Sequence, residues 1–106
     1  MSEAMVADDE GMPLNIQTWT YAAQELMSII STLDIQLPLM LPLQNGGIGA
    51  EWHDSGLNIE LRFRNPYQVY AVLEDAKGII PTLHDYDRNL AQARIALREL
   101  ATRTLA

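Results

Sequence analysis

The sequence predicts an α+β protein: an N-terminal helix, a three- to four-stranded antiparallel meander and a long C-terminal helix. Near both ends of the chain, apolar residues recur every three or four positions, which is the helical period. Through the middle they alternate with polar residues, and turn residues separate the alternating runs. The alternation makes one sheet face apolar, so we expect both helices to cover that face.

The N-terminal helix is predicted over residues 14–33. Asn15 or the stretch 11–13 is a candidate start. Asp34 and Pro38 end the helix, because proline has no amide hydrogen to donate. The residues expected on its apolar side are Ile16, Trp19, Ala23, Leu26, Met27, Ile30 and Leu33.

The meander begins after a hairpin signal at residues 45–47, Asn-Gly-Gly, which supplies the positive backbone dihedrals of tight turns. Residues 48–53 then alternate between apolar and polar, and the alternation resumes at residues 57–63 and again at 67–73. Residues 64–66, Arg-Asn-Pro, interrupt the alternation and are predicted to form the loop between the second and third of these runs. The expected pairs are Phe63 with Tyr67, Leu61 with Val69 and Ile59 with Ala71, which puts all six side chains on one face.

The C-terminal helix is predicted to begin at Thr82 as N-cap, with Asp85 as the capping-box acid, and to run to about Thr104. Its expected apolar side is Leu83, Tyr86, Leu90, Ala93, Leu97, Leu100 and Ala101. A long leucine-rich helix and the open edges of a short meander favour a homodimer. The candidate dimer contacts are Leu90, Leu97, Leu100 and Ala101.

The charge is distributed unevenly along the chain. Residues 1–61 hold nine acids and neither Lys nor Arg, whereas residues 62–106 hold seven bases and five acids. Phosphate backbones are bound by clustered Lys and Arg, so direct nucleic-acid binding is disfavoured. The acidic half suits a basic protein partner, and it is also typical of a surface that only serves solubility.

Composition excludes several classes of site. Without cysteine the chain has no disulfide, no thiolate nucleophile and no zinc-thiolate cluster. The most apolar run, residues 37–43, is far shorter than the roughly 20 residues that span a bilayer. Residues 1–12 contain four acids and no base, unlike a secretory signal. We expect a flexible acidic tail over residues 1–12, a single domain over 13–106, a cytoplasmic location and no membrane contact.

Residues 46–53 read Gly-Gly-Ile-Gly-Ala-Glu-Trp-His, and residues 57–61 alternate as Leu-Asn-Ile-Glu-Leu. This segment resembles short uncharacterised bacterial proteins. In those proteins a Gly-Gly turn leads into an apolar-x-x-Glu-Trp-His strand, and a second strand of alternating acids and aliphatic residues follows. The resemblance implies the hairpin and carries no reaction with it.

Catalytic and metal-binding motifs are weak. His53, Asp54 and Ser55 are consecutive, so they cannot make both contacts of a hydrolase triad. Two metal candidates are Glu51 with His53, which share a strand face, and the run His84-Asp85-x-Asp87. Neither has a familiar ligand spacing, and metal ions usually need three or more convergent donors. We therefore expect no metal and no cofactor.

The polar face of the sheet is the most interesting surface. Depending on the turn, Glu51 lies opposite Asn58 or Glu60, and two close carboxylates could make an acid/base pair with separated pKa values. We expect this face either to be solvated or to dock a partner. Its predicted residues are Glu51, His53, Asn58, Glu60, Arg62, Gln68 and Tyr70.

Three functional hypotheses follow. The first is a small protein-binding module without catalytic activity, for example a neutraliser of the antitoxin or immunity kind, or an acidic mimic of nucleic acid. The second is a small metal-assisted or acid/base enzyme that uses Glu51, His53 and Glu60. The third is a structural subunit or adaptor of a larger assembly, with the C-terminal helix as its docking element.

Overall fold

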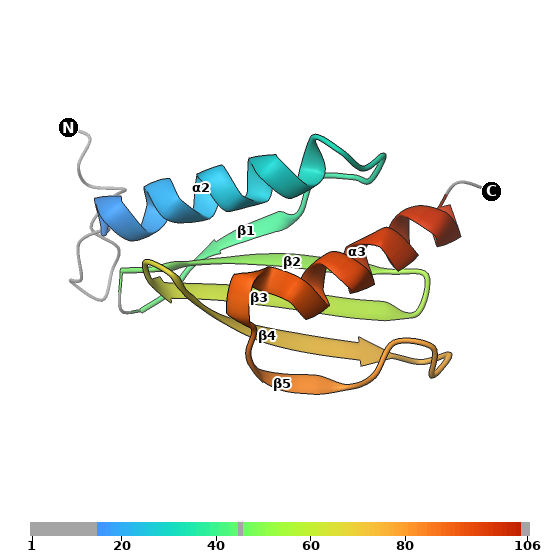
Figure 1. The fold of residues 1–106 in the computed structure, drawn as a ribbon. Coiled ribbons are helices and arrows are strands. Elements are labelled where there is room, and N and C mark those ends of the chain that lie inside the picture. The colour runs from blue at the N-terminus through green and yellow to red at the C-terminus, as the bar shows by residue number, and fades with distance from the viewer. Residues whose placement is uncertain (1–14, 45, 105–106) are drawn as a thin grey trace.

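The computed structural model describes residues 15–44 and 46–104 and confirms the α+β class. The expected tail over residues 1–12 and Asn45 of the turn lie outside the described residues. Helix α2 spans Ile16–Ile30 and helix α3 spans Ala91–Thr104 (Figure 1). Between them five antiparallel strands form one meander, in the order β1 (Leu39–Pro42), β2 (Ile48–Asp54), β3 (Leu57–Asn65), β4 (Gln68–Asp75) and β5 (Leu83–Tyr86). The sheet therefore has five strands instead of the three or four predicted, with a short strand at each edge.

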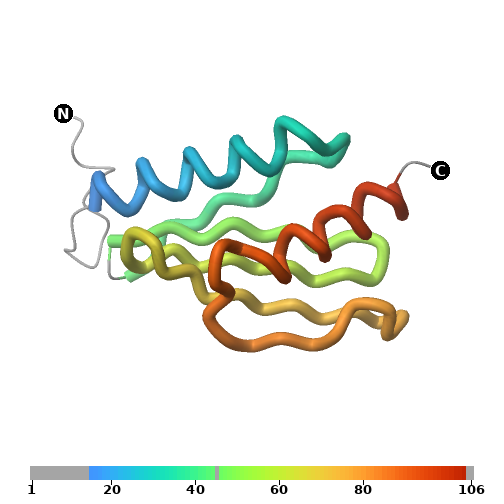
Figure 2. Tube along the Cα trace, in the orientation of Figure 1, coloured from blue at the N-terminus to red at the C-terminus, as the bar shows by residue number. Residues whose placement is uncertain are grey.

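The core lies between the sheet and both helices. Helix α2 contacts β2 and β3, and α3 contacts β3 and β4 (Figure 2). Alternate residues of the three central strands face the helices, as the period-two pattern predicts. The most completely buried of the large side chains on this face are Trp52, Ile59, Leu61, Phe63 and Leu73, each at most 1% exposed.

The turn between β2 and β3 fixes which residues oppose each other. Ser55 and Gly56 have φ values of 54° and 82°, as in the two-residue turns that suit the twist of a hairpin. Glu51 consequently lies opposite Glu60, one of the two alternatives that the sequence leaves open.

The predicted pairing of β3 with β4 is wrong by two residues. The turn uses Pro66 and Tyr67, with an irregularity in β3 between Phe63 and Asn65. Tyr67 has a φ of 68° and is 83% exposed, so it does not pair in the core. The observed pairs are Phe63 with Val69, Leu61 with Ala71 and Ile59 with Leu73. A shift of two residues keeps each strand side chain on the same face of the sheet, so the predicted apolar face of β3 and β4 is correct.

Helix α2 is rotated from its predicted orientation. The Oδ1 atom of Asn15 accepts a hydrogen bond from the Thr18 amide at 3.0 Å, which confirms Asn15 as the N-cap. The two apolar residues Ile16 and Met27, expected to be buried, are 71% and 64% exposed. The buried positions are Thr18, Ala22, Leu26 and Ile29. Two of these are small side chains, which let the helix lie close to the sheet.

The predicted start of the C-terminal helix is wrong. The segment that contains the expected capping box forms β5, with His84 opposite Val72 of β4. The cap is Asp87, whose carboxylate accepts hydrogen bonds from the amides of Gln92 and Ala93 at 3.0 and 2.7 Å. The helix-start pattern of residues 82–85 does not produce a helix here, because residues 83–86 pair with the edge of β4 instead.

The expected dimer contacts on α3 are used by the core. Leu90, Leu97 and Leu100 are at most 1% exposed, and Ala101 is half-buried. These leucines face the sheet, so they cannot also contact a second copy of the chain. A dimer would have to use another surface.

One ion pair ties the end of α3 to the sheet. The Asp75 carboxylate accepts two hydrogen bonds from the Arg103 guanidinium, at 2.9 and 2.7 Å, and both side chains are at most 5% exposed. It also accepts from the backbone amides of Lys77, Ile79 and Ile80, each at 2.9 Å. The Arg103 guanidinium holds the pKa of Asp75 well below its ordinary range.

We expect Arg103→Met to lower the free energy of unfolding clearly more than the control Arg94→Met. Asp75 would be left without its counterion, whereas Arg94 pairs with Glu25 at 3.4 Å and is one-third exposed, a pair worth about 0–1 kcal/mol. Because the pKa of Asp75 is lowered, its contribution is present above about pH 4 and is lost as the pH falls. Urea unfolding at neutral and acid pH measures both effects. Equal losses in the two variants would contradict this role.

Candidate binding face

The second face of the sheet is covered by neither helix. We call it the open sheet face and assign residues to it from the strand register, because directly opposed residues share a face. It presents Leu39 and Leu41 of β1, Glu51 and His53 of β2, Asn58, Glu60 and Arg62 of β3, Tyr70, Val72 and Glu74 of β4, and His84 and Tyr86 of β5. Six of the seven residues predicted for the polar face lie here. The seventh, Gln68, begins β4 and lines a hollow at the end of the sheet.

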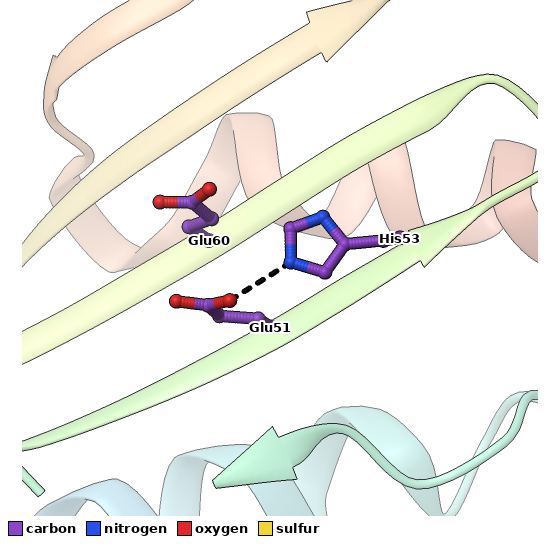
Figure 3. Close-up of side chains that lie close together, drawn as sticks. All are labelled: Glu51, His53 and Glu60. Carbon is purple, nitrogen blue, oxygen red and sulfur yellow. Dashed lines mark hydrogen bonds and ion pairs between the residues drawn. The ribbon is translucent and has the colours of Figure 1, made fainter. Parts of the chain in front are cut away.

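Glu51, His53 and Glu60 form a cluster near the middle of this face (Figure 3). Glu51 and His53 are two positions apart on β2, and the register places Glu60 opposite Glu51. The His53 Nε2 atom lies 2.8 Å from Glu51 Oε1, and one donor atom from each of the three residues lies within 4.8 Å of the others. The side chains of Glu51 and Glu60 are about four-fifths buried, and that of His53 is half exposed.

The surroundings of His53 favour its charged form. The hydrogen bond with Glu51 raises the pKa of His53, with smaller contributions from Glu60 and Asn58. Asn58 lies opposite His53, and its Nδ2 donates to Glu74 Oε1 at 2.9 Å. The oxygen of the same amide, Asn58 Oδ1, is buried and has no hydrogen-bond partner among the described residues.

The remaining charges on the face are also paired. Arg62 donates to Glu60 at 3.0 Å, and the His84 Nε2 atom lies 2.9 Å from Glu74 Oε2. Hydrogen bonds from Asn58 and His84 lower the pKa of Glu74. Both histidines of the chain therefore lie on the open sheet face, each beside a glutamate.

Aromatic and cationic side chains occupy one end of the face. The rings of Tyr70 and Tyr86 meet edge to face at 5.4 Å. The Arg62 and Arg64 guanidinium groups lie 5.9 and 5.8 Å from the centre of the Tyr70 ring. Tyrosine and arginine are enriched where proteins bind proteins.

Strand β1 adds an apolar edge that sequence reasoning missed. Leu37, just before the strand, is 76% exposed, and Leu39, Met40 and Leu41 are 57%, 41% and 36% exposed. No strand of the described chain pairs with the outer side of β1. The available signal was an apolar run between two prolines that lacked any helical or alternating pattern.

Two hollows between the described residues lie away from the cluster. One of about 680 Å³ is lined by residues that include Tyr21, Tyr67 and Tyr86, and one of about 300 Å³ lies between α2 and β1. Neither is lined by Glu51, His53 or Glu60. An open face suits the docking of a large partner better than the enclosure of a small substrate.

The other predicted metal group is not assembled. His84 pairs with Glu74 on the open sheet face, Asp85 accepts from the Tyr86 amide, and Asp87 caps α3. The consecutive residues His53, Asp54 and Ser55 form no triad either, because the histidine contacts Glu51 and the serine donates to Asp54.

Comparison of the chain with protein-family models, with curated proteins and with solved structures finds no match. The resemblance of residues 46–61 to short bacterial proteins therefore stays a prediction. Neither α2 nor α3 has the length and apolar character that a helix needs to cross a membrane.

We expect the pKa of His53, measured by NMR titration in metal-free buffer, to lie above about 6.5 and to fall in the Glu51→Gln variant. A raised pKa means that protonated His53 stabilises the fold below about pH 6.5, and that this stabilisation is lost as the pH rises through the folded-state value. A wild-type value at or below 6.5, or no change in the variant, would contradict the described contact.

Proposed function

We propose that this chain is a cytoplasmic protein-binding module without catalytic activity, and that it docks a basic protein partner on the open sheet face. The observation that carries the proposal is the placement of both helices on one side of the sheet, which leaves the other side uncovered. Antiparallel sheets commonly have one solvated face, so the composition of this face has to support the proposal.

The open sheet face combines apolar and charged side chains in the way that binding surfaces do. Exposed leucines lie at the β1 edge, tyrosines lie toward β5, and carboxylates lie between them. Protein interfaces typically have such an apolar and aromatic part with polar groups around it. Tyr86, which is 59% exposed, is the residue here most suited to anchor a partner.

The charge of the face favours a basic partner. The three glutamates of this surface outnumber its two arginines, Arg62 and Arg64, when both histidines are neutral. Complementary charge raises association rates and selects partners, and its effect weakens with added salt. A neutraliser of a basic toxin, or an acidic mimic of nucleic acid, is a specific form that such a module could take.

A small acid/base or metal-assisted enzyme is the second candidate, because Glu51, His53 and Glu60 do lie together. Their position on an open face weighs against it, since reaction sites usually have walls that exclude water. The third hypothesis, an adaptor that docks through α3, has less support because the leucines of α3 lie in the core.

The docking proposal predicts that charge reversal on the open sheet face weakens partner binding. We expect Glu51→Lys to reduce capture of the partner by the tagged protein about tenfold at low salt, and high salt to reduce it for wild type. Asp34→Lys, the same charge change at an exposed residue between α2 and β1, is the matched control and should leave capture unchanged. Quantitative mass spectrometry of the captured proteins measures the ratio. Equal capture by Glu51→Lys and wild type would refute docking at this face.

We also propose that two copies of the chain associate through the outer edge of β1. An edge strand with exposed apolar side chains is a ready template for pairing with another strand. Leu39, Met40 and Leu41 would lose their exposed surface in such a dimer. This edge replaces the α3 leucines as the candidate dimer contact.

The dimer is tested by light scattering over a range of concentrations. We expect wild type to be dimeric, the double variant Leu39→Lys/Met40→Lys to be monomeric, and Ile95→Lys to remain dimeric. Ile95 is the control because it is an exposed apolar residue on α3, the helix that contacts β3 and β4. A wild-type monomer at every concentration, or dissociation by Ile95→Lys, would rule out this dimer.

A further inference from the structure

We propose that Glu51, His53 and Glu60 bind a divalent transition-metal ion of the zinc class on the open sheet face. The sequence alone shows two donors on one strand, too few for a site. The register of β2 with β3 adds the third donor from the neighbouring strand. Such an ion would bind whether or not a protein partner docks on this face.

The three donors are close enough to converge on one ion. A tetrahedral zinc ion with bonds of about 2.1 Å holds its ligand atoms about 3.4 Å apart. The donor atoms here lie within 4.8 Å of one another, and two of them, His53 Nε2 and Glu51 Oε1, are 2.8 Å apart. Zinc would replace the hydrogen bond between His53 and Glu51 and release its proton to solvent. Rotations of the side-chain ends would then bring the three donors to the spacing that zinc requires, while the strand register fixes their backbone positions.

Asn58 provides the support that a metal-binding histidine needs. Such histidines almost always donate the N–H of the second ring nitrogen to an oxygen acceptor. In Figure 3 one ring nitrogen of His53 points to Glu51 and the other points toward β3, the strand that carries Asn58 opposite His53. The buried Asn58 Oδ1, which has no partner among the residues described, is the acceptor available for it.

The local charges also favour a cation. Glu51 and Glu60 are directly opposed like charges, an arrangement that destabilises a strand pair. Arg62 bonds only one oxygen of Glu60, and the other oxygen stays free to bind an ion. One divalent ion would compensate both carboxylates.

The donor types select the class of ion. One imidazole nitrogen with two carboxylates suits zinc and related transition metals, whereas magnesium prefers an all-oxygen shell with several waters. Three protein ligands leave a fourth position for water, as in zinc sites that are not purely structural.

Titration calorimetry with a zinc salt tests the site. We expect wild type to bind one zinc ion per chain and not to bind magnesium. His53→Gln and Glu60→Gln should each weaken zinc binding about tenfold or more. His84→Gln is the matched control and should bind like wild type, because His84 has the same short contact to a glutamate but no third donor beside it within residues 15–44 and 46–104.

Two further measurements keep the result interpretable. Circular dichroism and thermal unfolding establish that each variant is folded, since these changes lie on the open sheet face and should leave the core intact. NMR of the histidine rings should show zinc shifting the signals of His53 and not those of His84. Absence of zinc binding by folded wild type, or equal loss in His84→Gln and His53→Gln, would overturn the proposal.

Discussion

The placement of the apolar residues of β2, β3 and β4 at alternate positions is the constraint on which the structure depends. It places Trp52, Ile59, Leu61 and Leu73 on one side of the sheet, each at most 1% exposed. Burial of large apolar side chains is the main stabilising contribution in a domain of this size, so both helices must lie on that side. The opposite side of these three strands consequently carries mostly polar and charged residues, and neither helix covers it.

The alternation explains what sequence reasoning could predict. A residue's face depends only on whether its position is odd or even, so the faces of β4 are right even though its predicted register is wrong by two residues. Element ends depend on contacts distant in the sequence. The segment around His84 carries a helix-start signal, yet it pairs with β4, and Asp87 caps the helix instead. Likewise Thr18 and Ala22 are buried in α2 while the larger Ile16 and Met27 are exposed, which the apolar pattern alone does not predict.

The candidate site was likewise only partly predictable from the sequence. The sequence places Glu51 and His53 on one face, because they are two positions apart on a strand. Whether a third donor joins them depends on the turn at Ser55 and Gly56, and the sequence allows either Asn58 or Glu60 opposite Glu51. The orientation of the Asn58 amide depends in turn on Glu74 of β4, a contact that no local pattern reveals. The cluster is thus a consequence of sheet register, and so is its suitability for a cation.

Cross-linking through introduced cysteines tests this register most directly, because the chain has no cysteine of its own. Directly opposed residues have Cβ atoms about 4.5–5.5 Å apart, close to the separation that a disulfide requires, whereas diagonal neighbours are about 7–8 Å apart. The double variant Glu51→Cys/Glu60→Cys should form an intramolecular disulfide on mild oxidation, and Glu51→Cys/Asn58→Cys should stay reduced. Efficient cross-linking of the second pair and not the first would contradict the register, and with it the open sheet face described above.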